Sequence, residues 1–122
     1  MTKNERRRAI RAPARLAMEI KLSGSDYARV ESINVSANGV YFSSKRHIPL
    51  LTKLGITLML PETTEGAPAG THEVYCEGVV VRVDPEEPKK SPQDYEIACF
   101  FTSISEPDKG HLDTYILHQL AF

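Results

Sequence analysis

The sequence predicts a mainly β fold: a small six-stranded antiparallel β-barrel with a C-terminal α-helix and a flexible basic N-terminal arm. Most of the chain alternates between apolar and polar residues, which is typical of half-buried strands. One stretch near the C-terminus instead repeats its apolar residues at helical spacing, and arginines cluster ahead of the first strand. The 122 residues suffice for one domain with its own core, but hardly for two.

The first predicted strand covers residues 14–23, where apolar and polar side chains alternate strictly. Its apolar face consists of Leu16, Met18, Ile20 and Leu22. Further strands with the same alternation are expected at 27–36, 39–44, 53–61, 72–84 and 95–104. Together these strands form the predicted barrel, residues 14–104.

Two of these strands contain irregularities. The apolar residues change phase near Ser32, which predicts a β-bulge. Gly78 lies in the middle of the longest strand and predicts a bend or a bulge there. The connections at 61–72 and 84–94 are rich in proline, glycine and charge, so we expect mobile hairpin loops.

Residues 105–122 are predicted to form the C-terminal helix. Ser105 and Asp108 have the S-x-x-D spacing of a capping box, and Pro107 suits the first turn. So short an amphipathic helix needs a surface to pack on, and the barrel would supply it. The side chains expected to face the barrel are Leu112, Tyr115, Ile116, Gln119 and Leu120.

The net charge of −1 hides a strong asymmetry. Residues 1–15 contain six basic residues and only Glu5 as an acid, a balance of +5, so the remainder carries −6. We assign residues 1–13 to a basic arm. A basic arm on an acidic body suggests an anionic partner, but a solvated tail would have the same composition.

Several classes of protein are disfavoured by what the sequence lacks. No apolar run approaches the roughly 20 residues of a membrane helix, and no apolar h-region follows the N-terminal charges. We therefore expect a cytoplasmic protein without membrane insertion. Cys76 and Cys99 lie in apolar, strand-like runs, which favours two reduced core thiols, although a disulfide could form between neighbouring strands.

Catalytic patterns are also lacking. The four histidines show no metal-ligand spacing, and Ser36 has no G-x-S-x-G elbow around it. The chain contains neither a Walker loop nor a G-x-G-x-x-G loop. We therefore expect no enzyme activity, no metal and no cofactor.

The stretch INVSANGVYF, residues 33–42, concentrates small polar residues between two apolar strand ends. Asn38 and Gly39 fit a tight hairpin turn with positive φ values. That turn leaves Asn34 and Ser36 unexplained, because residues two apart in a strand point to the same side. Beside a glycine they would form a shallow rim at which a ligand can approach the backbone.

Two motifs together resemble those of the PilZ domain family. Arg7 and Arg11 form R-x-x-x-R, preceded by another arginine, and residues 34–39 form N-x-S-x-x-G. The family writes these motifs as R-x-x-x-R and [D/N]-x-S-x-x-G. The resemblance extends over residues 5–117, because EGVVVRV is similar to a later barrel strand and SEPDKGHLDTYI to the helix after the barrel.

The resemblance implies a bacterial receptor for cyclic di-GMP, a second messenger with two phosphates and two guanines. Arginine suits both groups, because its planar fork pairs with phosphate oxygens and with guanine O6 and N7, and it stacks on bases. The asparagine oxygen can accept from guanine N1 or N2, and the serine hydroxyl can donate or accept. The implied ligand-binding residues are Arg6, Arg7, Arg11, Asn34, Ser36 and Gly39.

Two details bear on the ligand. Many relatives have aspartate at the position of Asn34, and an ionised carboxylate makes a stronger, charge-assisted bond to guanine N–H groups, so we expect the neutral amide to weaken binding. An arginine at the position of Arg6 is associated in the family with binding a stacked pair of ligands. Arg15, at the start of the first predicted strand, fits a structural role as well as a functional one.

We expect the arm to be mobile alone, because its like charges repel, and to close over residues 34–39 when the ligand neutralises them. The ordered arm would then signal to an effector protein, which the sequence does not identify. An alternative is a PilZ-like adaptor that binds no nucleotide. A third reading, a barrel that binds single-stranded nucleic acid through the arm, is disfavoured by the 7% aromatic content without tryptophan. No DNA or RNA partner is therefore expected.

Overall fold

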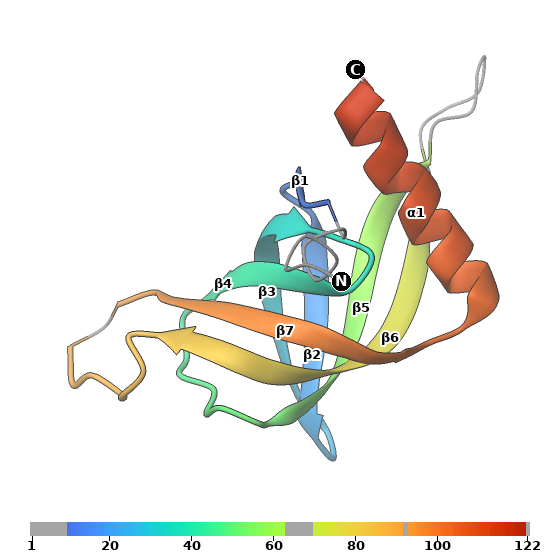
Figure 1. The fold of residues 1–122 in the computed structure, drawn as a ribbon. Helices are drawn as coiled ribbons and strands as arrows, with labels where there is room; N and C mark the ends of the chain where they lie inside the picture. The colour runs from blue at the N-terminus through green and yellow to red at the C-terminus, as the bar shows by residue number, and fades with distance from the viewer. Residues whose placement is uncertain (1–9, 63–69, 92, 122) are drawn as a thin grey trace, which may run out of the picture.

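The structure is a computed structural model that describes residues 10–62, 70–91 and 93–121. Within these described residues, seven strands and one helix follow one another, and Figure 1 shows their arrangement. They are β1 (Ala12–Pro13), β2 (Ala17–Ser23), β3 (Asp26–Val35), β4 (Gly39–Ser44), β5 (Lys53–Glu62), β6 (Gly70–Asp84), β7 (Tyr95–Ile104) and α1 (Glu106–Ala121).

The six longer strands form a closed antiparallel barrel in the order β3-β2-β5-β6-β7-β4, because β4 pairs with β3 as well as with β7. Each of these strands therefore pairs with a neighbour on both sides over part of its length. The two-residue strand β1 pairs with the end of β3, so β1 and β2 follow one another beside the same strand. The predicted fold class, a six-stranded antiparallel barrel with a C-terminal helix, is confirmed.

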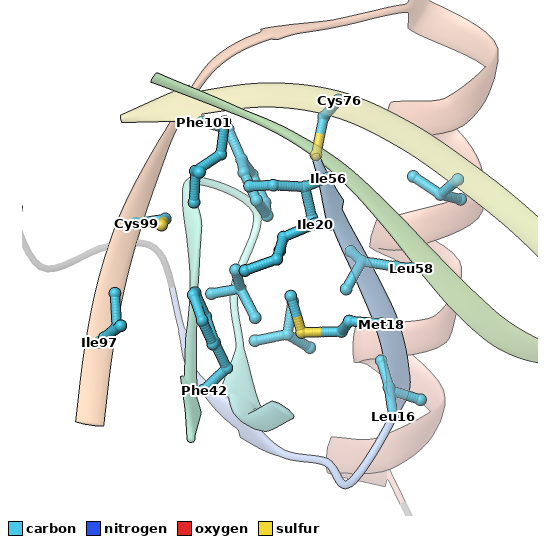
Figure 2. Close-up of a cluster of buried hydrophobic side chains, with 14 of the residues drawn as sticks. Leu16, Met18, Ile20, Phe42, Ile56, Leu58, Cys76, Ile97, Cys99 and Phe101 are labelled. Carbon is cyan, nitrogen blue, oxygen red and sulfur yellow. The ribbon is translucent and has the colours of Figure 1, made fainter. Parts of the chain in front are cut away.

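The core fills the barrel with the apolar faces that the alternation predicts. Figure 2 shows side chains from several strands meeting inside it, among them Met18, Ile20, Phe42 and Ile56. Alternate residues of β5 are buried as well, namely Leu54, Ile56, Leu58 and Leu60. Leu22, near the end of β2, is only partly buried. The interior is thus built from alternate residues of strands whose other side chains face water.

Both predicted irregularities are present. Ser32 pairs with Phe42 but Asn34 pairs with Tyr41, so Ile33 is the extra residue of a bulge. A register shift also occurs at Gly78. A Cβ atom there would lie 2.9 Å from the carbonyl oxygen of Phe100, so this glycine permits a close approach of β7.

Of the two proline-rich connections, only the first differs from its expected bounds, because β6 ends at Asp84 and β7 begins at Tyr95 as predicted. β5 continues through Pro61 to Glu62, and β6 begins at Gly70, ahead of the predicted start. Most of the expected loop, residues 63–69, lies outside the described residues. Register between β5 and β6 is continuous over this end, because Pro61 pairs with Thr71.

The helix α1 begins as predicted. The Ser105 hydroxyl accepts a hydrogen bond from the Asp108 N–H at 3.3 Å, as an N-cap does. The Asp108 carboxylate in turn accepts from the backbone N–H of Tyr75 in β6 at 3.1 Å. The helix packs against β6 and β1 (Figure 1).

The predicted apolar stripe of α1 is only partly correct. Leu112 and Ile116 are buried and Tyr115 packs against the core. Gln119 and Leu120 are exposed, so contact with the barrel ends one turn earlier than the sequence pattern indicates. No helix within the described residues is long and apolar enough to span a membrane.

Both cysteines are free and buried. Burial raises the pKa of Cys76 and of Cys99 to about 12, so both thiols are neutral near pH 7. Neutral buried thiols are poor nucleophiles, which fits a packing role. Among the residues that the structure describes, no group of three or more histidine, cysteine or acidic side chains could hold a metal ion.

Candidate ligand-binding site

The segment ahead of β2 is fastened along β3. Pro13 of β1 pairs with Asn34, the first residue of the N-x-S-x-x-G motif. After β1, the Ala14 N–H donates to the Ile33 carbonyl at 3.1 Å. Residues 12 and 13 therefore belong to the sheet, although they fall within the range assigned to the arm.

Ser32 anchors this segment. Its side chain is buried, and its hydroxyl donates to the Ala14 carbonyl at 2.5 Å and accepts from the Leu16 N–H at 2.8 Å. The Ser32 N–H also donates to the Leu16 carbonyl. Sequence reasoning located a bulge here but missed this anchoring role. The available signal was a polar residue at an inward-facing position.

Next to the anchored segment, Arg11 of the first motif contacts Asn34 of the second. Arg11 immediately precedes β1, and its Nη1 donates a hydrogen bond of 2.9 Å to Oδ1 of Asn34, 23 residues away. Arg11 is exposed and Asn34 is half-buried, so the contact lies at the surface. Arg6 and Arg7, the other arginines of the predicted site, lie outside the described residues.

Ser36 shapes the turn that follows. It is buried, and its N–H donates to the Gly39 carbonyl at 2.9 Å. Its hydroxyl accepts from the Asn38 N–H at 3.2 Å and donates weakly to the Gly39 carbonyl at 3.4 Å. The spacing of the motif does not predict this local role, in which the hydroxyl replaces backbone partners of the turn.

The expected turn geometry at Asn38 and Gly39 is wrong. Among the described residues, positive φ values occur at Gly24 and Leu51 only. Gly39 is required for a different reason: a Cβ atom there would lie 2.3 Å from the carbonyl oxygen of Cys99 in β7. The glycine lets β4 and β7 approach each other where the barrel closes.

A groove of about 590 Å³ lies along the anchored segment, a size within the range of small-molecule sites. Its residues come from the anchored segment, from β3 and β4, and from the connection just ahead of β7. Arg15 and Glu31 form an exposed ion pair at 3.4 Å beside it. The lining residues are Pro13, Ala14, Arg15, Glu31, Ser32, Ile33, Ser43 and Asp94.

Another polar cluster lies on the outer face of β4 and β7. The Tyr41 hydroxyl donates to the Glu96 carboxylate at 2.5 Å. This hydrogen bond, above all, raises the pKa of Tyr41. Tyr41 therefore stays protonated at neutral pH and serves as a hydrogen-bond donor. Tyr41 pairs with Asn34 across the bulge, so the cluster flanks the candidate site.

Known structures share this fold. Bacillus subtilis MotI/DgrA, an inhibitor of motility, superposes with a TM-score of 0.75 at 22% identity, covering 95% of this chain and 51% of that one. K. pneumoniae MrkH in its apo state gives 0.67 at 17% identity, covering 94% and 50%. The chain thus spans about half the length of these two proteins.

The PilZ domain of Escherichia coli YcgR, solved with c-di-GMP (cyclic di-GMP), gives a TM-score of 0.65 at 13% identity, covering 95% of this chain and 92% of that one. No curated protein sequence matches the chain. A family model, described as PilZ domain, matches residues 5–118, nearly the whole chain and both motifs. The chain therefore belongs to the PilZ domain family, as its two motifs indicate.

Proposed function

We propose that this protein is a bacterial cyclic di-GMP receptor and adaptor, which binds the dinucleotide between its N-terminal arginines and the N-x-S-x-x-G motif. The single observation that supports the proposal is the Arg11–Asn34 hydrogen bond, in which one residue of each motif contacts the other. Proteins of the PilZ family are regulatory receptors or adaptors, and the YcgR neighbour is solved with this ligand.

The chemistry of the site suits a dianionic dinucleotide. Arg6, Arg7 and Arg11 would pair with phosphates and with guanine O6 and N7, since guanidinium is a planar donor for both. Asn34 would contribute an uncharged amide beside them. Ser36 and Gly39 would act mainly by fixing the turn that carries Asn34, given their burial.

Signalling would follow from ordering of the arm. The phosphates neutralise the arm's like charges, so the ligand binds better when the arm lies against the barrel than when it is extended. The closed arm and the ligand together form a surface for an effector protein. We assign no catalytic step and no cofactor to this mechanism, and we place it in the bacterial cytoplasm.

Calorimetric titration with cyclic di-GMP tests the proposal. Arg7→Ala and Arg11→Ala should each weaken binding by roughly 10- to 100-fold, the usual effect of removing a hydrogen bond to a charged group. Arg29→Ala is the matched control, because Arg29 is an exposed arginine of β3 paired with Glu19, away from the motifs. Equal affinities for all four proteins would contradict the proposed site. The stoichiometry tests whether Arg6 permits two ligands.

One observation favours a second candidate, an adaptor that binds no nucleotide. Asn34 and Ser36 already have partners within the chain, so the site is partly satisfied without a ligand. This candidate predicts no heat with cyclic di-GMP and a partner protein that binds equally well without it.

A further inference from the structure

We propose that this protein docks on an anionic lipid surface through the outer face of β5 and β6, next to the connection that enters β5 from β4. Figure 1 shows this connection at one end of the barrel. The contact is peripheral, with side chains that reach the headgroup layer of the lipid. Because the Arg11–Asn34 contact lies beside β1 and β3, the docking face is a separate surface, and the inference does not rest on the proposed function.

Exposed apolar side chains gather around this connection. Backbone hydrogen bonds fasten it to β6, from the Leu51 N–H to the Val80 carbonyl at 2.7 Å and from the Val80 N–H to the Thr52 carbonyl at 2.9 Å. Of the nine large apolar side chains that are exposed in the described residues, five lie here or on the adjoining strands, which marks an interaction surface. The docking face consists of Lys21, Tyr27, Leu50, Leu51, Lys53, Tyr75 and Val81.

Leu51 is held outward at a conformational cost. Its side chain is 75% exposed, and its φ of 67° lies in the left-handed region, which leucine disfavours. The bonds to β6 keep this residue in place, and the Thr52 hydroxyl donates to the Pro49 carbonyl at 2.7 Å. Strain of this kind concentrates at functional sites, and here its result is a fixed aliphatic projection.

A groove of about 520 Å³ lies beside the leucines, with Lys21 and Lys53 on its walls. Gly55 leaves room for it, and a Cβ atom at this position would lie 2.9 Å from the Tyr75 hydroxyl. Glu77 also lines the groove, which therefore has two cations against one carboxylate. An ammonium group pairs with phosphate oxygens as a point charge, so the groove suits the phosphate of a lipid headgroup.

The composition of the docking face matches the interface between lipid and water. Tyrosine places its ring at the edge of the acyl chains and its hydroxyl among the headgroups. Lysine lies along apolar surface with its charge in water, as Lys21 does over the Tyr27 ring, 5.7 Å from the centroid. A second copy of the chain fits less well, because a twofold contact through this face would bring lysines of like charge together.

Co-sedimentation with vesicles tests the inference. Wild type should bind phosphatidylcholine vesicles that contain about one third phosphatidylglycerol roughly 10-fold more tightly than pure phosphatidylcholine vesicles, and added salt should weaken this binding. Leu51→Gly should lower the affinity about 10-fold without loss of stability, because glycine suits a φ of 67°. Leu117→Ala is the control, since it shortens a comparably exposed leucine of α1, and should stay within about 2-fold of wild type.

Lys53→Gln tests the electrostatic part of the contact. One lysine near an anionic surface contributes enough that its loss should weaken vesicle binding about 5-fold. Lys109→Gln makes the same chemical change at an exposed position of α1 and should leave the affinity within about 2-fold of wild type. Equal losses in the two lysine variants would show attraction by overall charge alone and would overturn the proposed face.

The basic N-terminus is the competing source of vesicle binding. If Leu51→Gly and Lys53→Gln bind vesicles as wild type does while Arg7→Ala loses binding, the N-terminal arginines are responsible and the inference is overturned. Wild type that binds neither kind of vesicle also overturns it and leaves a protein as the partner of this face. Affinity for cyclic di-GMP should be unchanged in Leu51→Gly and Lys53→Gln, so the inference and the proposed function fail separately.

Discussion

The two halves of the candidate site are held in different ways. Ser36 and Gly39 are buried, and the turn between them is tied by hydrogen bonds to its own backbone and to β7. Arg11 is exposed and reaches the site through one side-chain hydrogen bond. The two motifs therefore contain residues of two kinds, those that build the turn and those that can exchange a protein contact for a ligand contact.

The largest effect on stability is expected at Gly39. In Gly39→Ala the new Cβ meets a backbone carbonyl at 2.3 Å, and neither strand of a closed barrel can move freely away. We expect the free energy of unfolding to fall by about 3 kcal/mol or more, measured by urea denaturation.

Gly110→Ala is the matched control for this change. Gly110 lies in α1 and has open space around its Cβ position, so alanine should raise stability by roughly 1 kcal/mol through helix propensity. If Gly39→Ala were as stable as wild type, the turn would be more adaptable than its packing indicates.

Ser32→Ala should have the next largest effect. It leaves the buried Leu16 N–H and the Ala14 carbonyl without their hydroxyl partner, at a cost of about 2 kcal/mol. Because the same bonds hold the segment that carries Arg11, affinity for cyclic di-GMP should fall as well. Ser103→Ala, at an exposed position of β7, should change neither quantity. Lost stability with unchanged affinity would show that the anchor does not position Arg11.

The strands could be predicted because their signal is local. Alternation along each strand decides which side chains face the core, so the buried residues of β2, β5 and β7 follow directly from the sequence. The bulge near Ser32 and the irregularity at Gly78 also leave a local trace, a change of phase and a glycine inside an apolar run.

Other features depend on residues that are distant in the chain. The role of Gly39 depends on Cys99, which becomes its neighbour only when β7 closes the barrel. The anchoring by Ser32 depends on the register between β3 and the preceding segment. The exposure of Leu120 depends on where the barrel ends beneath α1. These contacts join residues that are far apart in the chain, so a local sequence pattern does not predict them.

Ser36→Ala should cost less than Ser32→Ala. The hydroxyl accepts one hydrogen bond from the Asn38 N–H and donates a long one, of 3.4 Å, to the Gly39 carbonyl. Because the backbone bond from Ser36 to Gly39 remains, we expect a loss of about 1 kcal/mol in thermal or urea denaturation. Ser36→Thr, which keeps the hydroxyl, should recover part of it. A strong loss of binding at unchanged stability would instead make Ser36 a ligand contact.

Arg11→Ala should have the smallest effect on stability and the clearest effect on binding. The side chain is exposed and its one hydrogen bond is to a surface amide, so the free energy of unfolding should change by less than about 0.5 kcal/mol. Affinity for cyclic di-GMP should nevertheless fall, and Arg11→Lys should restore little of it, because an ammonium lacks the planar fork. A stability loss above about 1 kcal/mol would place Arg11 with Ser36 and Gly39 among the residues that build the turn. Unchanged stability with lost binding would instead show that Arg11 contributes to ligand binding and not to the fold. Its hydrogen bond to Asn34 could then be replaced by hydrogen bonds to the ligand.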